Sequence, residues 1–228
     1  MTIAAVITTF NRRELLQEAL ASVRSQTRVP DEIVILDDGS TDGTREKMES
    51  VSDVRYHWQA NAGTSAARNA GWKMAQSEWI AFLDSDDLWD EAKLARQEAC
   101  AKENPSLEVI FGHGINFATP GQEALFQATE HHLDRALPAW LPSAALIRRA
   151  TLERMGGFDV GIKTAEVVDW VMRLRQADVP MCMLPETVLR RRLHSGNKQL
   201  QDDVGRRENL ALVHRWMQQK REKSVKNA

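Results

Sequence analysis

The chain has 228 residues, of which 43% are hydrophobic and 27% charged, with a formal net charge of −2. This composition fits a globular protein with a sizeable core, and the charge balance gives no support to nucleic-acid binding. The sequence starts without the basic and long apolar regions of a secretory signal, and no apolar run is long enough to span a bilayer. Cys100 and Cys182 predict neither a disulfide framework nor a cysteine metal site, so we expect a cytoplasmic protein.

The first hundred residues alternate between apolar runs and amphipathic segments. The apolar runs predict strands at 3–8, 32–36, 54–58 and 79–83. The segments between and after them predict helices at 13–25, 40–50, 64–75 and 90–103. Such alternation is typical of an α/β fold with a parallel sheet covered by helices on both faces.

The second half is less regular. It predicts strands at 109–117 (interrupted by glycines), 143–148, 181–184 and 188–193, and helices ending at Gly156 and spanning 166–176 and 208–220. Residues 119–140 are expected to form a loop with short elements. The basic helix at 208–220 is expected to pack its apolar side on the core, and the alternative is contact with an anionic membrane. No linker is evident, which favours a single domain over residues 1–228.

Three polar clusters follow predicted strands, at residues 8–11, 37–40 and 84–87. Parallel strands bring their carboxyl ends to one edge of the sheet, where ligands bind in such folds. In the last cluster, Asp84 and Asp86 are oxygen ligands suited to Mg²⁺ or Mn²⁺. The alternative is a solvated turn in which Asp87 or Asp90 caps the next helix.

The other polar segments also have two interpretations. Asp37 and Asp38 either form a strand-to-helix turn or accept hydrogen bonds from a nucleobase imide or a ribose hydroxyl. The small residues of 61–71 allow close approach of a ligand or of a neighbouring strand. Within that segment, Arg68 is a candidate partner for a phosphate or for the aspartates, or else part of a structural Arg–Asp pair.

Four segments together resemble the family 2 glycosyltransferases in order and spacing, over about residues 3–100. They are "VITTFNR", "SVRSQTRVPDEIVILDDGSTDGT", "NAGTSAARNAGW" and "SEWIAFLDSDDLW". The resemblance implies the GT-A fold, a nucleotide-binding α/β sandwich with a mostly parallel sheet. It also implies inverting transfer from a nucleotide-sugar donor, often a UDP-sugar. Residues 1–104 would then bind the nucleotide sugar, and residues 105–228 would form the acceptor side.

By position in these motifs, the resemblance assigns a donor site and a metal site. The donor-binding residues are Thr8 and Asp38, which hold the base, with Phe10, Asp37, Arg68, Asp84 and Ser85. The metal ligands are Asp86, Asp84 and His194, which could instead contact the pyrophosphate, and an arginine among 190–192 could neutralise the departing phosphate.

The catalytic base is the point at which this sequence departs from the family. Residues 155–159 resemble the segment before the acceptor helix, after which the family usually shows Glu-Asp-x-Asp. Here Val167 occupies the usual aspartate position. An inverting transfer needs a carboxylate to take the acceptor proton, and Glu166 and Asp169 share a helix face. Glu166 is preferred because it opens the motif; the alternative is that Glu166 caps the helix and Asp169 pairs with Arg173.

The predicted function is therefore metal-dependent inverting glycosyl transfer, of the kind used in polysaccharide biosynthesis. Its acceptor is a saccharide, a lipid-linked molecule or a peptide, and its location is cytoplasmic or peripheral at the inner membrane face. Two other classes stay open: a nucleotide-sugar-binding protein that has lost catalysis, and a nucleotidyltransferase, which would release pyrophosphate.

Overall fold

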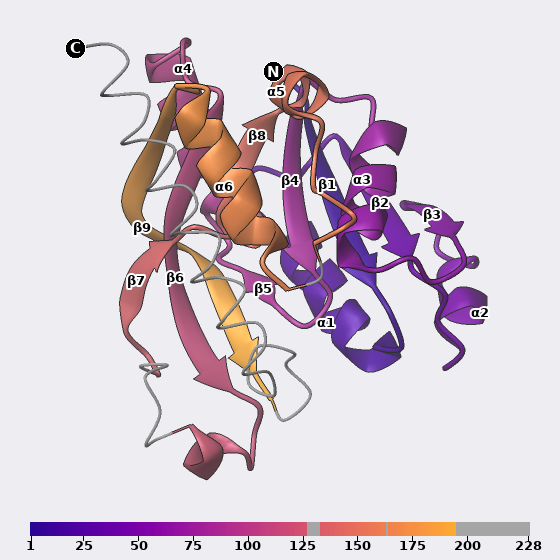
Figure 1. The fold of residues 1–228 in the computed structure, drawn as a ribbon. Coiled ribbons are helices and arrows are strands. Elements are labelled where there is room, and N and C mark those ends of the chain that lie inside the picture. Colours follow the sequence, from indigo (N-terminus) through magenta and orange to yellow (C-terminus); the bar gives the residue numbers. More distant parts are fainter. Residues whose placement is uncertain (127–132, 163, 195–228) are drawn as a thin grey trace.

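The computed structural model describes residues 1–126, 133–162 and 164–194. Within these ranges a nine-stranded sheet runs in the order β3-β2-β1-β4-β8-β6-β9-β5, with β7 paired to β6 (Figure 1). The strands are β1 (Ile3–Thr9), β2 (Glu32–Asp37), β3 (Arg55–Trp58), β4 (Trp79–Asp84), β5 (Leu88–Trp89), β6 (Val109–Ala118), β7 (Ala136–Ala139), β8 (Leu146–Arg148) and β9 (Met181–Leu193). The helices are α1 (Arg13–Arg24), α2 (Thr44–Met48), α3 (Thr64–Met74), α4 (Lys93–Glu103), α5 (Arg149–Met155) and α6 (Glu166–Gln176), with short 3-10 turns at Glu123–Leu125 and Pro142–Ala144.

The first half of the sheet is parallel and the second half is mixed. β1 pairs in parallel with β2 and β4, and β2 pairs in parallel with β3. Beyond β4, the β4–β8, β8–β6, β6–β7 and β5–β9 pairs are antiparallel, while β6–β9 is parallel. The predicted α/β class with flanking helices is confirmed, and the antiparallel pairs lie in the part of the chain that the sequence patterns describe least well.

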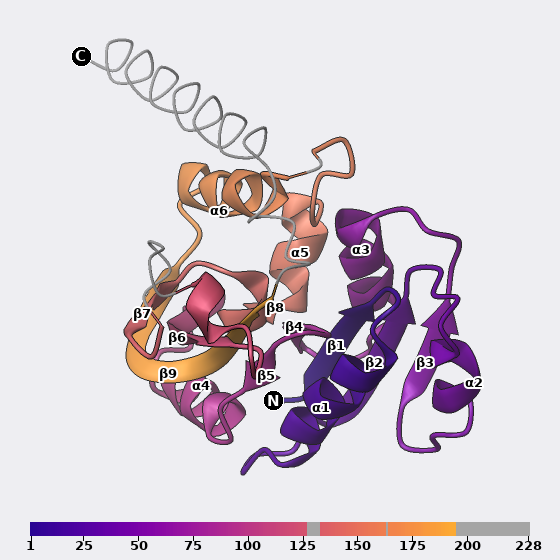
Figure 2. The ribbon, with the colours of Figure 1, turned by 90° about the horizontal axis from the view of Figure 1, so that it is seen from below.

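Helices cover both faces of the sheet, as the alternation predicts (Figure 2). On one face, α1 and α4 bury Leu16, Leu20 and Leu94 against the strands. On the other face, α3, α5 and α6 bury a second set that includes Trp72 and Trp170. Each of these fully buried side chains contributes about 1.5–3 kcal/mol relative to leaving it exposed.

Two glycines allow close contacts that hold this architecture together. A Cβ on Gly71 of α3 would lie 2.5 Å from Cγ1 of Val6, so the absence of a side chain brings α3 close to β1. A Cβ on Gly112 would lie 2.6 Å from Val188, which explains why glycines do not interrupt β6. The strand predicted at 109–117 is therefore continuous, and the irregularity expected at its glycines lies in the pairing with β9, which shifts register on both sides of His113.

Several boundaries differ from the predicted ones, among them those of α2 (Thr44–Met48, predicted at 40–50) and β8 (Leu146–Arg148, predicted at 143–148). The segments expected as separate strands at 181–184 and 188–193 form one strand, β9, although its pairing with β6 shifts register between Met183 and Thr187 and again before Leu189. The helix expected at 90–103 begins at Lys93, since the Asp90 side chain accepts the Ala92 N–H at 3.1 Å. The helix expected at 208–220 lies outside the described residues. Across the part of the chain that the structure describes, no helix is both long and apolar enough to cross a membrane.

The two cysteines contact each other without forming a disulfide. Sγ of Cys100 on α4 lies 3.5 Å from Sγ of Cys182 on β9, and both thiols are free. Burial, together with the hydrogen bond to Cys100, raises the pKa of Cys182 to about 12. As predicted, the two cysteines form no disulfide, and both are partly buried.

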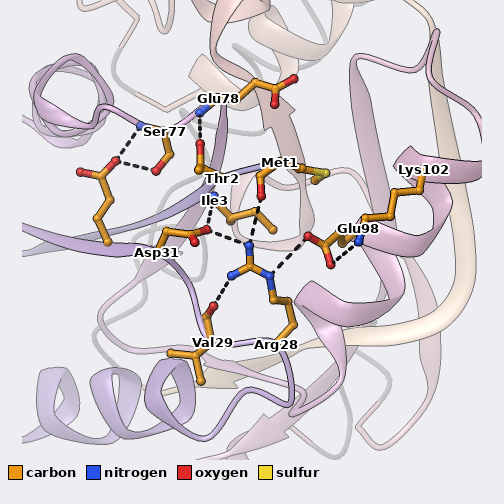
Figure 3. Close-up of polar contacts among 11 residues, drawn as sticks. Met1, Thr2, Ile3, Arg28, Val29, Asp31, Ser77, Glu78, Glu98 and Lys102 are labelled. Atoms are coloured by element: carbon orange, nitrogen blue, oxygen red, sulfur yellow. Dashed lines mark hydrogen bonds and ion pairs between the residues drawn. The ribbon is translucent and has the colours of Figure 1, made fainter.

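Arg28 is the centre of a polar network at the edge of the sheet where β1 and β4 begin. Figure 3 shows Arg28 between the carboxylates of Asp31, at 2.7 Å, and Glu98, at 3.4 Å. Arg28 also donates to the Met1 carbonyl, and Asp31 accepts the Ile3 N–H at 2.8 Å. This network fixes the start of β1, so that the opposite ends of the strands are held in register.

Candidate active site

The parallel register brings the polar clusters of β1, β2 and β4 to one edge, as predicted. Thr8 lies opposite Asp84 in the β1–β4 pair, and Thr9 lies opposite Asp37 in the β1–β2 pair. The Thr8 hydroxyl donates to Asp84 at 3.3 Å. Phe10, the first residue after β1, is 46% exposed, whereas the strand residues before it are buried. An exposed aromatic ring beside this polar edge offers a flat surface for a planar ligand.

The two carboxylates after β2 organise the loops that border the edge. Asp37 is fully buried and accepts the Ser40 N–H at 2.8 Å and the Tyr56 hydroxyl at 2.6 Å. Burial, then the hydrogen bond to Asp37, raises the pKa of Tyr56 well above its ordinary value.

Asp38 holds the loop that leads into α3. It accepts the backbone N–H groups of Ala62 and Gly63, at 2.9 and 2.8 Å, and the side-chain amide of Gln59 at 2.7 Å. Contact of Asp37 or Asp38 with a nucleobase stays a prediction. In the present arrangement both carboxylates shape the loops around the edge.

Asp84 ends β4 at the centre of the edge. Both of its carboxylate oxygens accept from Arg68 at 2.9 Å, and its N–H donates to the Ser143 hydroxyl at 3.3 Å. The next residue, Ser85, is 1% exposed, and its hydroxyl has no hydrogen-bond partner among the described residues. Asp84 therefore links the end of β4 to α3 through its contact with Arg68.

The Asp86 carboxylate contacts two side chains from distant parts of the chain, those of Arg12 and His194. Its Oδ2 lies 2.6 Å from the guanidinium of Arg12, which follows β1, and 3.1 Å from Nε2 of His194, which follows β9. Burial raises the pKa of Asp86, but the His194 hydrogen bond and the Arg12 charge outweigh it and hold the pKa below its usual range. The predicted proximity of Asp86 and His194 is therefore present.

The rest of the acidic turn is held by β9. Arg192 donates its backbone N–H to Asp87 at 2.9 Å and its side-chain Nε to the Asp86 carbonyl at 2.9 Å, and it pairs with Glu18 of α1 at 2.6 Å. Burial, then the charges of Asp86 and Asp84, raises the pKa of Asp87 well above its ordinary value. Arg192 is 5% exposed, so it contacts the turn from the protein interior.

The donor set at this turn fits a divalent cation bound jointly with a substrate. Asp86 and His194 are a carboxylate and an imidazole within 3.1 Å of each other. Ions such as Mg²⁺ are commonly held by one or two protein groups, with phosphate oxygens and waters completing the shell. The described residues contain no group of three or more His, Cys, Asp or Glu side chains arranged to hold a metal alone. Any ion held by Asp86 and His194 would therefore need ligand oxygens to complete its shell.

The structure separates the two candidate bases on α6. Glu166, its first residue, lies 3.3 Å from the guanidinium of Arg68 and so faces the edge. Asp169 pairs with Arg173 at 2.8 Å, and Arg173 in turn donates to the carbonyls of Met155 and Gly157. Glu166 therefore lies at the site. Asp169 instead holds Arg173 against the carbonyls at the end of α5, in agreement with the alternative that Asp169 pairs with Arg173.

Sequence reasoning missed several residues that build the site. Asn69 donates to the Phe158 carbonyl at 2.7 Å and accepts the Phe158 N–H at 2.9 Å. Arg12 and Ser143 contact the acidic turn directly. The motif "NAGTSAARNAGW" contains Asn69 next to Arg68, and "VITTFNR" ends at Arg12. The motifs therefore marked these positions, but their partners lie up to 89 residues away along the chain.

Comparison with known proteins gives a family and a fold. The model for Glycosyl transferase family 2 matches residues 4–154. A UDP-Glc:alpha-D-GlcNAc-diphosphoundecaprenol beta-1,3-glucosyltransferase, WfgD, of Escherichia coli is 32% identical over 114 residues, covering 49% of this chain and 45% of that protein. The chain spans about half the length, or less, of the curated relatives it matches.

Solved structures share the fold at lower identity. The structure of S. aureus TarS 1–349 in complex with UDP has a TM-score of 0.68 and 22% identity, covering 85% of this chain and 61% of that chain. The mannosyltransferase PcManGT from Pyrobaculum calidifontis, in complex with GDP-Man and Mn²⁺, has a TM-score of 0.63 and 20% identity, covering 87% and 59%. Both likenesses support the same sheet architecture.

Proposed function

The chain belongs to glycosyl transferase family 2, and on that basis we propose that it transfers a sugar from a UDP-sugar, with inversion, to a hydroxyl of a lipid-linked saccharide. One arrangement carries the proposal. Glu166 on the acceptor side and Asp84 on the donor side both contact Arg68, so a base and a donor-binding carboxylate meet at one edge of the sheet.

On the donor side, each part of a UDP-sugar has a candidate partner. Thr8, Phe10 and the loops held by Asp37 and Asp38 would receive the nucleoside, with Asp84 and Ser85 beside the ribose. Asp86 and His194 would hold a Mg²⁺ or Mn²⁺ ion, which when bound supplies Lewis-acid stabilisation of the leaving diphosphate. The two solved complexes, one with UDP and one with GDP-Man and Mn²⁺, support a nucleotide-sugar donor and a divalent ion as ligand classes.

On the acceptor side, Glu166 would take the proton. The acceptor oxygen attacks the anomeric carbon from the face opposite the diphosphate, the bond to the diphosphate breaks, and the hydroxyl proton passes to the Glu166 carboxylate. A single displacement of this kind inverts the anomeric configuration. Position 167 carries valine where the family usually has aspartate. Because Glu166 can act as the base in its place, this difference does not require a loss of catalysis.

The choice of acceptor rests on relatives. WfgD and a second Escherichia coli relative, WfaP, are named as acting on a diphosphoundecaprenol-linked sugar. These names support a lipid-linked saccharide as the acceptor class of the present chain.

A thermal-shift screen of nucleotides tests the proposal. UDP and UDP-sugars with Mn²⁺ are expected to raise the melting temperature by roughly 5–10 °C at about 100 times their dissociation constant, because they bind the native state. Mn²⁺ alone and GDP with Mn²⁺ are the matched controls and should give smaller shifts. A panel in which no nucleoside diphosphate stabilises the protein would reject nucleotide-sugar binding, and a larger response to GDP would reject the UDP assignment.

A further inference from the structure

Arg68 is a buried arginine that contacts two carboxylates from opposite sides of the site. It lies on α3, is 4% exposed, and donates through one terminal nitrogen to both oxygens of Asp84 at 2.9 Å. Its other terminal nitrogen lies 3.3 Å from Glu166. Burial alone would lower the pKa of Arg68, but the charges of Asp84 and Glu166 raise it above its ordinary value. The guanidinium is therefore a fixed cation between the two carboxylates.

The surroundings of Arg68 restrict its position further. The guanidinium carbon lies 5.4 Å from the centre of the Phe158 ring, within the range of a cation–π contact. The Phe158 ring in turn packs on Trp170 of α6, with ring centres 5.3 Å apart. The planar fork of arginine can address two partners at once, which the single ammonium of lysine cannot do in the same geometry.

The next residue on α3 fixes the chain that leads to Glu166. The side chain of Asn69 makes two hydrogen bonds to the backbone of Phe158, eight residues before Glu166. Gly157 lies so close to Asn69 that a side chain there would collide with it. Arg68 and Asn69 together therefore hold both the start of α6 and the segment before it against α3.

We propose that Arg68 is a positioning residue that sets the Glu166 carboxylate in place for proton removal and couples its position to that of Asp84. This inference rests on the proposed role of Glu166 as base. Arg68 acts through Glu166, so removing either side of the contact should damage the same step. A base misplaced by about 1 Å can cost roughly 100-fold in rate.

The experiment compares Arg68→Lys, Glu166→Gln and the double variant in sugar-transfer kinetics. Arg68→Lys is expected to lower kcat by about 100-fold, with the donor KM changed by less than about threefold. Glu166→Gln should cost less than about threefold more in the Arg68→Lys background, because the base is already misplaced. Arg28→Lys is the matched control, since Arg28 also bridges two carboxylates but at the opposite edge (Figure 3). It should retain kcat within about twofold.

Three results would overturn the inference: losses that multiply in the double variant, a change confined to the donor KM, or wild-type kcat in Arg68→Lys. If Arg68→Lys does not fold, Glu166→Asp shortens the same contact from the other side. It should also lower kcat without weakening UDP binding, and wild-type kcat there would reject the coupling.

A readout without turnover separates this inference from the proposed function. The melting temperatures of Arg68→Lys, Glu166→Ala and their double variant should be non-additive, because Glu166→Ala removes the carboxylate that contacts Arg68. Additive melting shifts would reject the Arg68–Glu166 coupling. Absence of any sugar transfer by the wild type, together with non-additive melting shifts, would instead reject the proposed function and confine Arg68 to a structural role.

Discussion

Replacing Glu166 with Gln is expected to lower kcat by about 10²–10⁴-fold, the usual contribution of a general base. Gln has nearly the same shape and keeps an oxygen that can accept from Arg68, so the contact with α3 should persist. The loss should therefore appear in kcat, with little change in donor binding or in melting temperature. Initial rates of UDP release in the presence of acceptor, measured alongside UDP binding by calorimetry, check both parts.

Asp169→Asn provides the comparison on the same helix. It removes the same charge three residues later, but its ion-pair partner is Arg173, one turn further along α6. We expect its kcat to stay within about threefold of the wild type and its effect to fall on stability. If Asp169→Asn abolished turnover and Glu166→Gln did not, the assignment of the base would have to be reversed.

Replacing Asp86 with Asn is expected to lower turnover by about 10²–10³-fold. This is the usual cost when an enzyme loses one group that stabilises the charge developing in the transition state. The variant keeps the size of the side chain but removes the negative charge that Arg12 and His194 now share. Activity should also stop responding to added Mn²⁺. The measurement is the transfer rate as a function of Mn²⁺ concentration, after treatment of the protein with a chelator.

Asp90→Asn is the matched control for that charge. Asp90 lies four residues further along, where it accepts the N–H of Ala92, just before α4, and pairs with Arg96 at 3.0 Å. Its turnover and Mn²⁺ response should remain close to those of the wild type. If the wild type kept full activity after chelation, or if Asp86→Asn kept full activity, metal-dependent transfer would be rejected.

The fold of the first half could be predicted because its signals are local. Continuous apolar runs indicate β1, β2 and β4, and helical spacing indicates α1 and α3. The parallel register then follows from the alternation of strands and helices, and with it the meeting of Thr8, Asp37 and Asp84 at one edge.

The second half depends on pairing between distant segments. β5 has two residues and exists through its pairing with β9, about 100 residues later. β9 continues through Pro185, where its pairing with β6 shifts register between Met183 and Thr187. Sequence periodicity alone therefore divided β9 in two and gave no sign of β5.

The choice of partners within the site is also a tertiary property. The sequence placed Glu166 and Asp169 on one helix face and left the base between them. Their separation comes from Arg68, 98 residues before Glu166, and from Arg173, on the same helix as Asp169. Likewise, the contact of Arg12 with Asp86 joins the ends of β1 and β4, which only the folded sheet brings together.

A crystal structure of the protein with UDP and Mn²⁺ tests the central claim most directly. The account predicts the nucleoside beside Thr8 and Phe10, with the diphosphate and the ion at Asp86 and His194. UDP bound elsewhere in the crystal, or a bound ion that contacts neither Asp86 nor His194, would contradict it.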